Sequence, residues 1–270
     1  METGMKKLLL LIISLLAIGG NAQAAYVSSW DYALSARFID STLVNGASLP
    51  DGTTLVWGGD SRKSSLVIDP SAIVSSVNTF VGEGAVPESF WADSIDLTHN
   101  NFPIIDPALN FTTLQVSVLL TPDEFGAPSL PLQQFTFDIA FKETPNVGAY
   151  QNDVFVLIGG FPDFNFFYNA DAQVFSPVAL PGFEKYNVNV FSSIGGVLSE
   201  LDANYAALAG VPVGSIGFTT PEGFATTLGF SFTISTPPLA APVPEPATMV
   251  LLGVGLLGLG IIGGRKSRKG

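Results

Sequence analysis

Alternation of apolar and polar residues is the feature that most constrains how this chain can fold. In the segment QFTFDIAFKE (134–143), one face would carry only large apolar side chains, namely Phe135, Phe137, Ile139 and Phe141. The segment TTLGFSFTIS (226–235) repeats this pattern with Leu228, Phe230, Phe232 and Ile234. A period of two residues is typical of a β-strand with one buried face. We therefore expect a chain built mainly from half-buried strands.

Further segments with β-branched and aromatic residues are separated by Pro, Gly, Asn and Asp, which favour turns. They predict strands at 53–59, 64–69, 112–120, 153–159, 184–193 and 215–220. One helix is predicted at 198–210, with Gly210 ending it and Pro212 preventing its continuation. The predicted fold class is mainly β: a single antiparallel β-sandwich or jelly-roll-like domain with one short helix.

The first 24 residues read as a secretory signal peptide. Lys6 and Lys7 precede an apolar run that is too short to span a membrane. Ala22 and Ala24 form a small-x-small cleavage signal, so we expect cleavage after Ala24. This segment predicts export through the Sec translocon.

The last residues have the properties of a single membrane span. Residues 247–264 carry no charge and would extend roughly 27 Å as a helix, at ~1.5 Å per residue. Four basic residues follow at once and would remain cytoplasmic, which leaves the body of the chain outside the inner membrane. They are Arg265, Lys266, Arg268 and Lys269. A Pro- and Ala-rich linker at 236–243 separates this tail (244–270) from the predicted exported domain (25–235).

The tail resembles the PEP-CTERM sorting signal. The resemblance rests on Pro244-Glu245-Pro246, the Gly-rich apolar span and the terminal basic cluster. It implies processing by an exosortase in a Gram-negative bacterium that makes exopolysaccharide. The expected localisation is an inner-membrane-anchored precursor and then, after removal of the tail, the cell surface or the extracellular space.

The charge of the predicted exported domain excludes one class of partner. The whole chain has 11 basic and 23 acidic residues, of which six basic and two acidic residues lie in the end segments. The domain therefore has a net charge near −16, and we expect no binding to nucleic acid through charge. Because the chain has no cysteine, it can form no disulfide and use no thiol chemistry.

The single histidine, His99, lies in the polar stretch DSIDLTHNNFPIID (93–106). A structural calcium ion could draw on carboxylates of this stretch, namely Asp93, Asp96 and Asp106, although their spacing matches neither an EF-hand loop nor an Asp-Gly repeat. The alternative, which we favour, is that His99 and the asparagines hydrogen-bond a turn between strands. A lone histidine without cysteine makes a transition-metal site improbable, and no cofactor is expected.

The sequence LTHNNFPI resembles the signature of the THxN group of PEP-CTERM proteins, with Thr98, His99 and Asn101 as the named residues. The segments LVWGG (55–59), SSLVI (64–68), FKETPN (141–146) and DVFVL (153–157) extend the resemblance over most of the chain. The resemblance names the motif but carries over no activity, and it leaves the role of the motif open. Within FKETPN, we expect Glu143 to be an exposed carboxylate of a turn.

These features predict a non-enzymatic protein with a structural or adhesive role in a matrix, biofilm or floc, where an extracellular polysaccharide is a candidate partner. A glycan- or calcium-binding β-sandwich module is the alternative. A secreted hydrolase is a remote alternative, because His99 could join a serine and an aspartate in three dimensions, but no GxSxG motif supports it.

Overall fold

The computed structural model describes residues 26–237 apart from 60, 125, 145–150, 161–162 and 194–196. A compact unit spans Ala24–Pro237. The predicted signal peptide, the sorting tail and all but the first two residues of the predicted linker lie outside the described residues. In the described part of the chain, no helix is long and apolar enough to cross a membrane.

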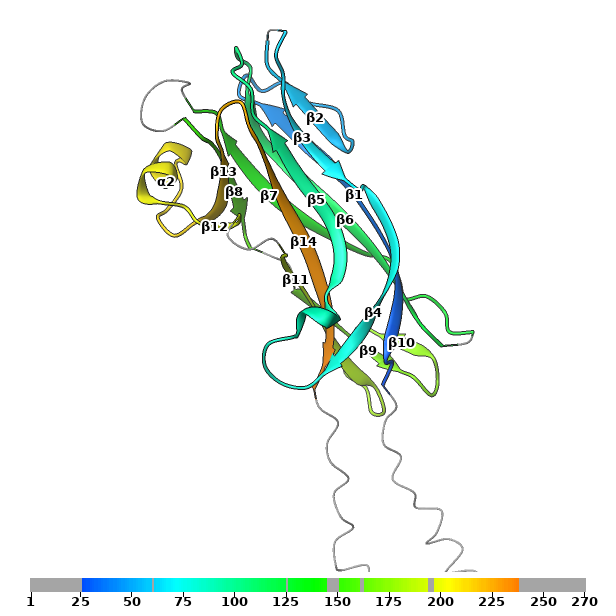
Figure 1. The fold of residues 1–270 in the computed structure, drawn as a ribbon. Helices are drawn as coiled ribbons and strands as arrows, with labels where there is room; N and C mark the ends of the chain where they lie inside the picture. The colour runs from blue at the N-terminus through cyan, green and yellow to red at the C-terminus, as the bar shows by residue number, and fades with distance from the viewer. Residues whose placement is uncertain are drawn as a thin grey trace, which may run out of the picture. The chain divides into compact units, whose positions relative to one another are not determined.

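In the described part of the chain, fourteen strands form one continuous sheet (Figure 1). One half of it, called here the β1 half, has the strand order β4-β1-β6-β7-β8-β13-β12. Its strands are β1 (Ser29–Leu43), β4 (Ala72–Val81), β6 (Leu109–Pro122), β7 (Gln133–Lys142), β8 (Asp153–Ile158), β12 (Ser199–Glu200) and β13 (Ile216–Thr220).

The other half, called the β14 half, has the order β2-β3-β5-β14-β11-β9-β10. Its strands are β2 (Thr54–Trp57), β3 (Ser64–Asp69), β5 (Ala92–Asn100), β9 (Asp163–Asn169), β10 (Val174–Ser176), β11 (Glu184–Ser192) and β14 (Ala225–Thr236). Strand β4 joins the halves, because it pairs with β1 through Asn78 and then runs parallel to the end of β14.

Aromatic side chains from the two halves pack against each other in the core. The ring of Trp30 on β1 lies 5.3 Å from Phe166 on β9 and 5.2 Å from Tyr186 on β11. Tyr32 on β1 meets Phe232 on β14 at 5.0 Å. Each pair is edge-to-face, an arrangement that adds about 0.5–1.5 kcal/mol to the free energy of area burial. The mainly β prediction is therefore confirmed, while the strand order is that of one continuous sheet and the sandwich or jelly-roll type stays a prediction.

Every predicted strand segment overlaps a strand, and 64–69 coincides with β3. The four apolar residues predicted to share a face in 226–235 are all buried. Six strands were not predicted from the sequence, namely β1, β4, β5, β9, β10 and β12. In β1 the buried positions do alternate, but alanine and serine dilute the pattern, and the long pairing with β4 and β6 holds the strand instead.

The predicted helix is shorter than expected. Ser199 and Glu200 pair with β13, so the helix α2 (Ala203–Ala209) begins only after Asp202. The Asp202 carboxylate accepts hydrogen bonds from the backbone N–H groups of Asn204 and Tyr205, as an N-cap does. The C-terminal end is as predicted, since Gly210 adopts a left-handed conformation with φ of 71°.

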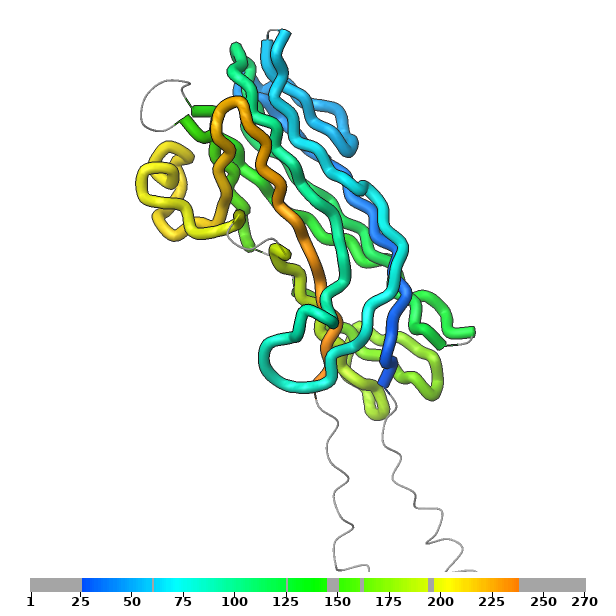
Figure 2. Tube along the Cα trace, in the orientation of Figure 1, coloured from blue at the N-terminus to red at the C-terminus, as the bar shows by residue number. Residues whose placement is uncertain are grey.

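Both ends of the compact unit lie at one end of the long strands. Next to β4, the N–H of Thr79 donates to Ser28 O, and the N–H of Gly82 donates to Thr236 O. Strand β14, which is 12 residues long, ends here and begins at the opposite end. This length corresponds to about 40 Å at ~3.3 Å per residue. Figure 2 shows the β13–β14 turn and the segment after β5 together at that opposite end, called here the distal end.

Two glycines after Trp57 let the segment 102–107 pack closely at the distal end. The N–H of Gly59 donates to Ile105 O at 2.6 Å, and the N–H of Gly58 donates to Pro107 O. A Cβ atom at residue 59 would lie 2.5 Å from Asp106 O, a distance at which backbone must shift.

We therefore expect Gly59→Ala to lower the free energy of unfolding by about 1–3 kcal/mol, as overpacking does. Urea unfolding of the compact unit measures the effect. Gly52→Ala is the matched control, because the nearest atom to its Cβ would lie 4.0 Å away, and it should be neutral or slightly stabilising. Equal stabilities of the two variants would contradict the close-approach explanation.

Candidate functional site

His99 lies within a strand and not in the turn that the sequence suggested. Strand β5 runs between β3 and β14, and His99 is paired with Leu66 on one side and Thr226 on the other. Alternation along β5 points Leu97 and His99 into the core. The prediction of a turn at His99 is wrong because the pairing of β5 with both neighbours continues through Asn100.

Aromatic rings enclose the imidazole of His99, which is 0% exposed. It stacks on Trp57 at 5.7 Å and meets the edges of Phe141 at 5.6 Å and Phe155 at 4.6 Å. Neither imidazole nitrogen has a hydrogen-bond partner among the described residues. Burial lowers the pKa of His99 to about 3, so the ring is neutral at physiological pH.

The two other residues of the THxN motif have different contacts. Thr98 lies on the opposite side of β5 from His99, and its Oγ1 is 2.8 Å from Oγ1 of Thr227 on β14. Asn101 is fully buried and holds the β13–β14 turn. Its N–H donates to Phe224 O, its C=O accepts from the Gly223 N–H, and its Nδ2 donates to Thr220 O at 2.9 Å. An asparagine thus does hold a turn, but one that lies more than a hundred residues away in the chain.

The three aspartates proposed as calcium ligands do not form one site. Asp93 and Asp96 lie on β5, where burial and then the charges of Asp69 and Asp93 raise the pKa of Asp96. Asp106 instead lies at the distal end, where its charge acts on Glu143. Within the described residues, no three His, Cys, Asp or Glu side chains are grouped so that they could hold a metal ion.

A second set of acidic residues, called here the distal carboxyl cluster, comprises Glu143, Asp153 and Glu222. Glu143 directly follows β7, Asp153 is the first residue of β8, and Glu222 lies in the β13–β14 turn. Asp153 is 0% exposed, and its Oδ1 accepts from the Thr144 N–H at 3.0 Å. Both carboxyl oxygens of Glu143 are buried, so the expectation of an exposed turn carboxylate is wrong.

Burial is the main cause of the raised pKa values of the carboxyl groups in this cluster. It raises the pKa of Glu143, and the neighbouring Asp153 raises it further. Burial likewise raises the pKa of Asp153, although the hydrogen bond from the Thr144 N–H opposes this. The pKa of Glu222 is raised by burial and lowered by the Gly223 N–H and by Arg62. Because ionised carboxylates repel each other in a buried site, the cluster favours a proton or a cation.

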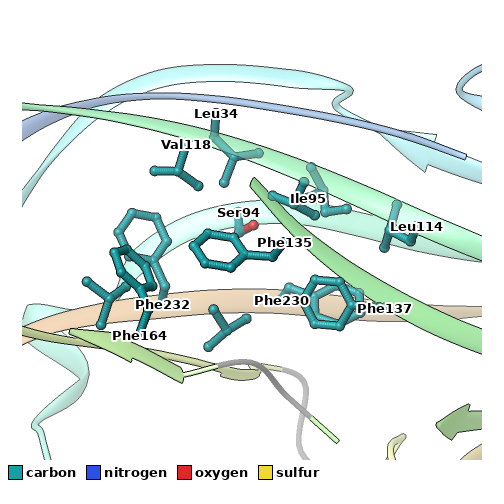
Figure 3. A pocket seen from close by; sticks show the side chains of 13 residues that line it. Leu34, Ser94, Ile95, Leu114, Val118, Phe135, Phe137, Phe164, Phe230 and Phe232 are labelled. Carbon is teal, nitrogen blue, oxygen red and sulfur yellow. The ribbon is translucent and has the colours of Figure 1, made fainter. Parts of the chain in front are cut away.

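The core itself offers little room for a ligand. A cavity of about 20 Å³ lies between the two halves of the sheet, and its lining is apolar apart from Ser94 (Figure 3). Phe135 and Phe164 fill one side of it, while Phe230 and Phe137 fill another. Ligand pockets usually measure about 300–1,000 Å³, so this cavity is a packing gap. The distal end is therefore the stronger candidate site.

Sequence reasoning did not find Asp153 and Glu222. Asp153 begins an apolar strand in DVFVLIG, and Glu222 sits in the turn PEG, where acidic residues are common. Strand pairing places Asp153 opposite Thr220. Nδ2 of Asn101 then reaches Thr220 O, although the two residues are far apart in the sequence. The sequence shows only that Asp153 is an acid at the start of an apolar strand. Its burial, which marks it as unusual, is known only from the structure.

The burial of His99 predicts a specific pH dependence. Its pKa is about 3 when folded and about 6.5 when unfolded, so the unfolded state binds more protons between these values. Stability from this residue is complete above the unfolded pKa and is lost as the pH falls. Between pH 7 and pH 5 we expect a loss of about 2 kcal/mol.

Urea unfolding of the wild type and of His99→Phe at both pH values isolates this contribution, because all other titrating groups are shared. The Phe variant keeps an aromatic ring among Trp57, Phe141 and Phe155 but cannot be protonated. It should lose about 2 kcal/mol less than the wild type on acidification. An identical loss in both proteins would show that His99 can be charged inside the fold.

One comparison with known proteins identifies a part of the chain. Residues 242–269 match the model of the PEP-CTERM protein-sorting motif. No curated protein matches the chain. The resemblance of the C-terminal tail is thereby confirmed, whereas assignment to the THxN group stays a prediction. The motif marks the chain as an exported protein that is made as a membrane-anchored precursor and sorted by an exosortase.

Proposed function

We propose that the mature protein is a structural or adhesive component of the cell surface or extracellular matrix of an exopolysaccharide-producing Gram-negative bacterium. The observation that carries this proposal is the sorting motif at residues 242–269. Export would begin with cleavage of a Sec signal peptide after Ala24, and the inner membrane would hold the precursor only until the tail is removed. Membership of the THxN group and a sandwich-type fold belong to the same proposal.

The arrangement of the compact unit supports this role. Tyr26 and Pro237 lie at the end that leads into the predicted linker, and the distal end is about 40 Å away along β14. Large side chains are exposed there, including Phe102, Ile105 and Phe224. Single exposed apolar residues are common, but Phe102 directly follows the buried Asn101, and Phe224 O accepts the Asn101 N–H.

A non-enzymatic role is the better proposal for His99. A catalytic imidazole must reach the proton that it accepts, whereas this ring is fully buried among three aromatic side chains. Its lowered pKa also makes it a poor base near neutral pH. A glycan- or calcium-binding module remains the second candidate, because the distal carboxyl cluster offers buried oxygen ligands.

Sorting is tested by replacing Pro244, Glu245 and Pro246 together with alanine in the host. We expect the precursor to keep its tail and to remain in the membrane fraction, because the exosortase would not recognise it. Pro237→Ala is a matched proline control outside the motif and should be processed normally. Gel mobility and cell fractionation measure both outcomes, and normal processing of the triple variant would contradict exosortase sorting through this motif.

The proposed matrix role is tested by co-sedimentation of the purified exported domain with the host's own exopolysaccharide, in calcium and in EDTA. Saturable co-sedimentation in both conditions would support a matrix protein that binds polysaccharide directly. Loss of it in EDTA would favour the calcium-binding module. Deletion of the gene should in addition weaken aggregation or the matrix, and an unchanged matrix phenotype would count against the proposal.

A further inference from the structure

Several buried oxygen atoms at the distal end accept hydrogen bonds but have no donor among the described residues. They are both carboxyl oxygens of Glu143, Oδ2 of Asp153 and Oδ1 of Asn101. The hydroxyl of Thr220 also has no partner there. Buried polar groups are almost always satisfied in folded proteins, and each that is not costs about 1–3 kcal/mol. So many acceptors at one end of the fold point to a positively charged ligand.

The backbone holds the fully buried members of this group together. Asp153 and Thr220 are direct partners on the antiparallel strands β8 and β13, so their side chains lie on the same face of the sheet. Both residues are 0% exposed. The amide nitrogen of Asn101 donates to Thr220 O, which anchors the Asn101 side chain at the end of β13. The Thr144 N–H fixes Oδ1 of Asp153 and leaves its Oδ2 as the acceptor without a donor.

Glu143 brings a second negative charge to this point. Its interaction with Asp153 is close enough that a proton on one carboxyl group would bond to the other. The Thr144 hydroxyl is a further donor near Asp153. One shared proton together with this hydroxyl would still leave Asn101 Oδ1 and one carboxyl oxygen of Glu143 without a donor. Glu222 lies farther out in the β13–β14 turn, where it also interacts with Arg62.

We propose that Glu143 and Asp153, with the side-chain oxygens of Asn101 and Thr220, bind one calcium ion at the distal end. The four residues supply two carboxylates, one amide oxygen and one hydroxyl, which are hard oxygen ligands of the kind that calcium takes in sets of 6–8, with water completing the shell. No third acidic side chain is needed, which agrees with the absence of any group of three metal-binding acids in the described residues. Glu222 borders the site.

Magnesium fits this set less well, because it demands octahedral geometry at short distances and keeps several waters. Zinc and other transition metals prefer nitrogen and sulfur ligands. The imidazole of His99 is enclosed by aromatic rings, and the chain has no cysteine. The proposed site is also separate from Asp93 and Asp96, whose charges act on each other along β5.

The test is thermal unfolding of the compact unit in calcium, in magnesium and in EDTA, at one pH and constant ionic strength. This unit can be studied alone because all the described strand pairing and core packing lies within Ala24–Pro237. Calcium at about a hundredfold excess over its Kd should raise the Tm by roughly 5–10 °C relative to EDTA, and magnesium should raise it less. Calorimetric titration should give one calcium ion per chain.

Glu143→Gln and Asp153→Asn should each abolish most of the calcium-dependent rise while remaining folded in EDTA, because each removes a buried charge and keeps the side-chain shape. Glu83→Gln, an exposed acid on the loop after β4, should keep the full rise. Asp96→Asn should keep it as well.

Absence of a calcium-dependent rise and of saturable binding in the wild type would overturn the proposal and leave the carboxyl pair sharing a proton. Equal stabilisation by calcium and magnesium, or a rise that Glu143→Gln retains, would also overturn it. A rise lost in Asp96→Asn alone would place the ion on β5 and not at the distal end. The wild-type titration decides the question even if one variant fails to fold.

Discussion

The packing of aromatic side chains between the two halves of the sheet is the interaction on which the rest of the structure depends. Trp30 is completely buried and contacts the rings of Phe166, Tyr168 and Tyr186. Aromatic side chains of this size each bury about 150–250 Å². A chain without cysteines has no disulfide to hold it once it is exported. Its stability therefore comes from burial in this core and from the hydrogen bonds of the strands around it.

This packing also decides where the polar groups gather. In the long strands, most side chains that point inward are apolar, so buried carboxylates are tolerated best at the strand ends, where the core stops. Asp153 begins β8, Thr220 ends β13 and Asn101 follows β5. One terminus of each of these three strands lies at the distal end, although the strands are distant in the sequence. The reason is that pairing along the rest of each strand fixes its register. The distal end is thus a consequence of how the core closes.

His99 and Asn101 show how neighbouring residues acquire different roles. His99 points into an aromatic enclosure and packs as part of the core. Asn101, two residues later, leaves the strand and forms three hydrogen bonds with the β13–β14 turn. A sequence motif that names both residues therefore describes a structural junction between β5, β13 and β14. The junction places the proposed ligands next to the core without exposing His99.

Local patterns predicted the larger part of the strands but not their partners. The alternation in 134–143 located β7 and its buried face, because apolar side chains at every second residue indicate both a strand and the face that it buries. Strand β5 was read as a turn, because the polar residues of LTHNN are typical of turns and its two neighbouring strands come from distant segments. Glu143 was expected to be exposed for the same reason, since the acidic residues that surround it, Asp106, Asp153 and Glu222, are not its neighbours in the sequence.

The sequence by itself determined that the protein is exported as a membrane-anchored precursor, and it determined the charge and the mainly β character, because sorting signals, composition and strand periodicity are all local properties. Only the tertiary structure decided that His99 is a core residue and that Glu143, Asp153, Asn101 and Thr220 meet at one end. The physical reason is that such a meeting depends on the register of strands far apart in the chain. That register is set by the collective packing of the core and is not recorded in any short segment.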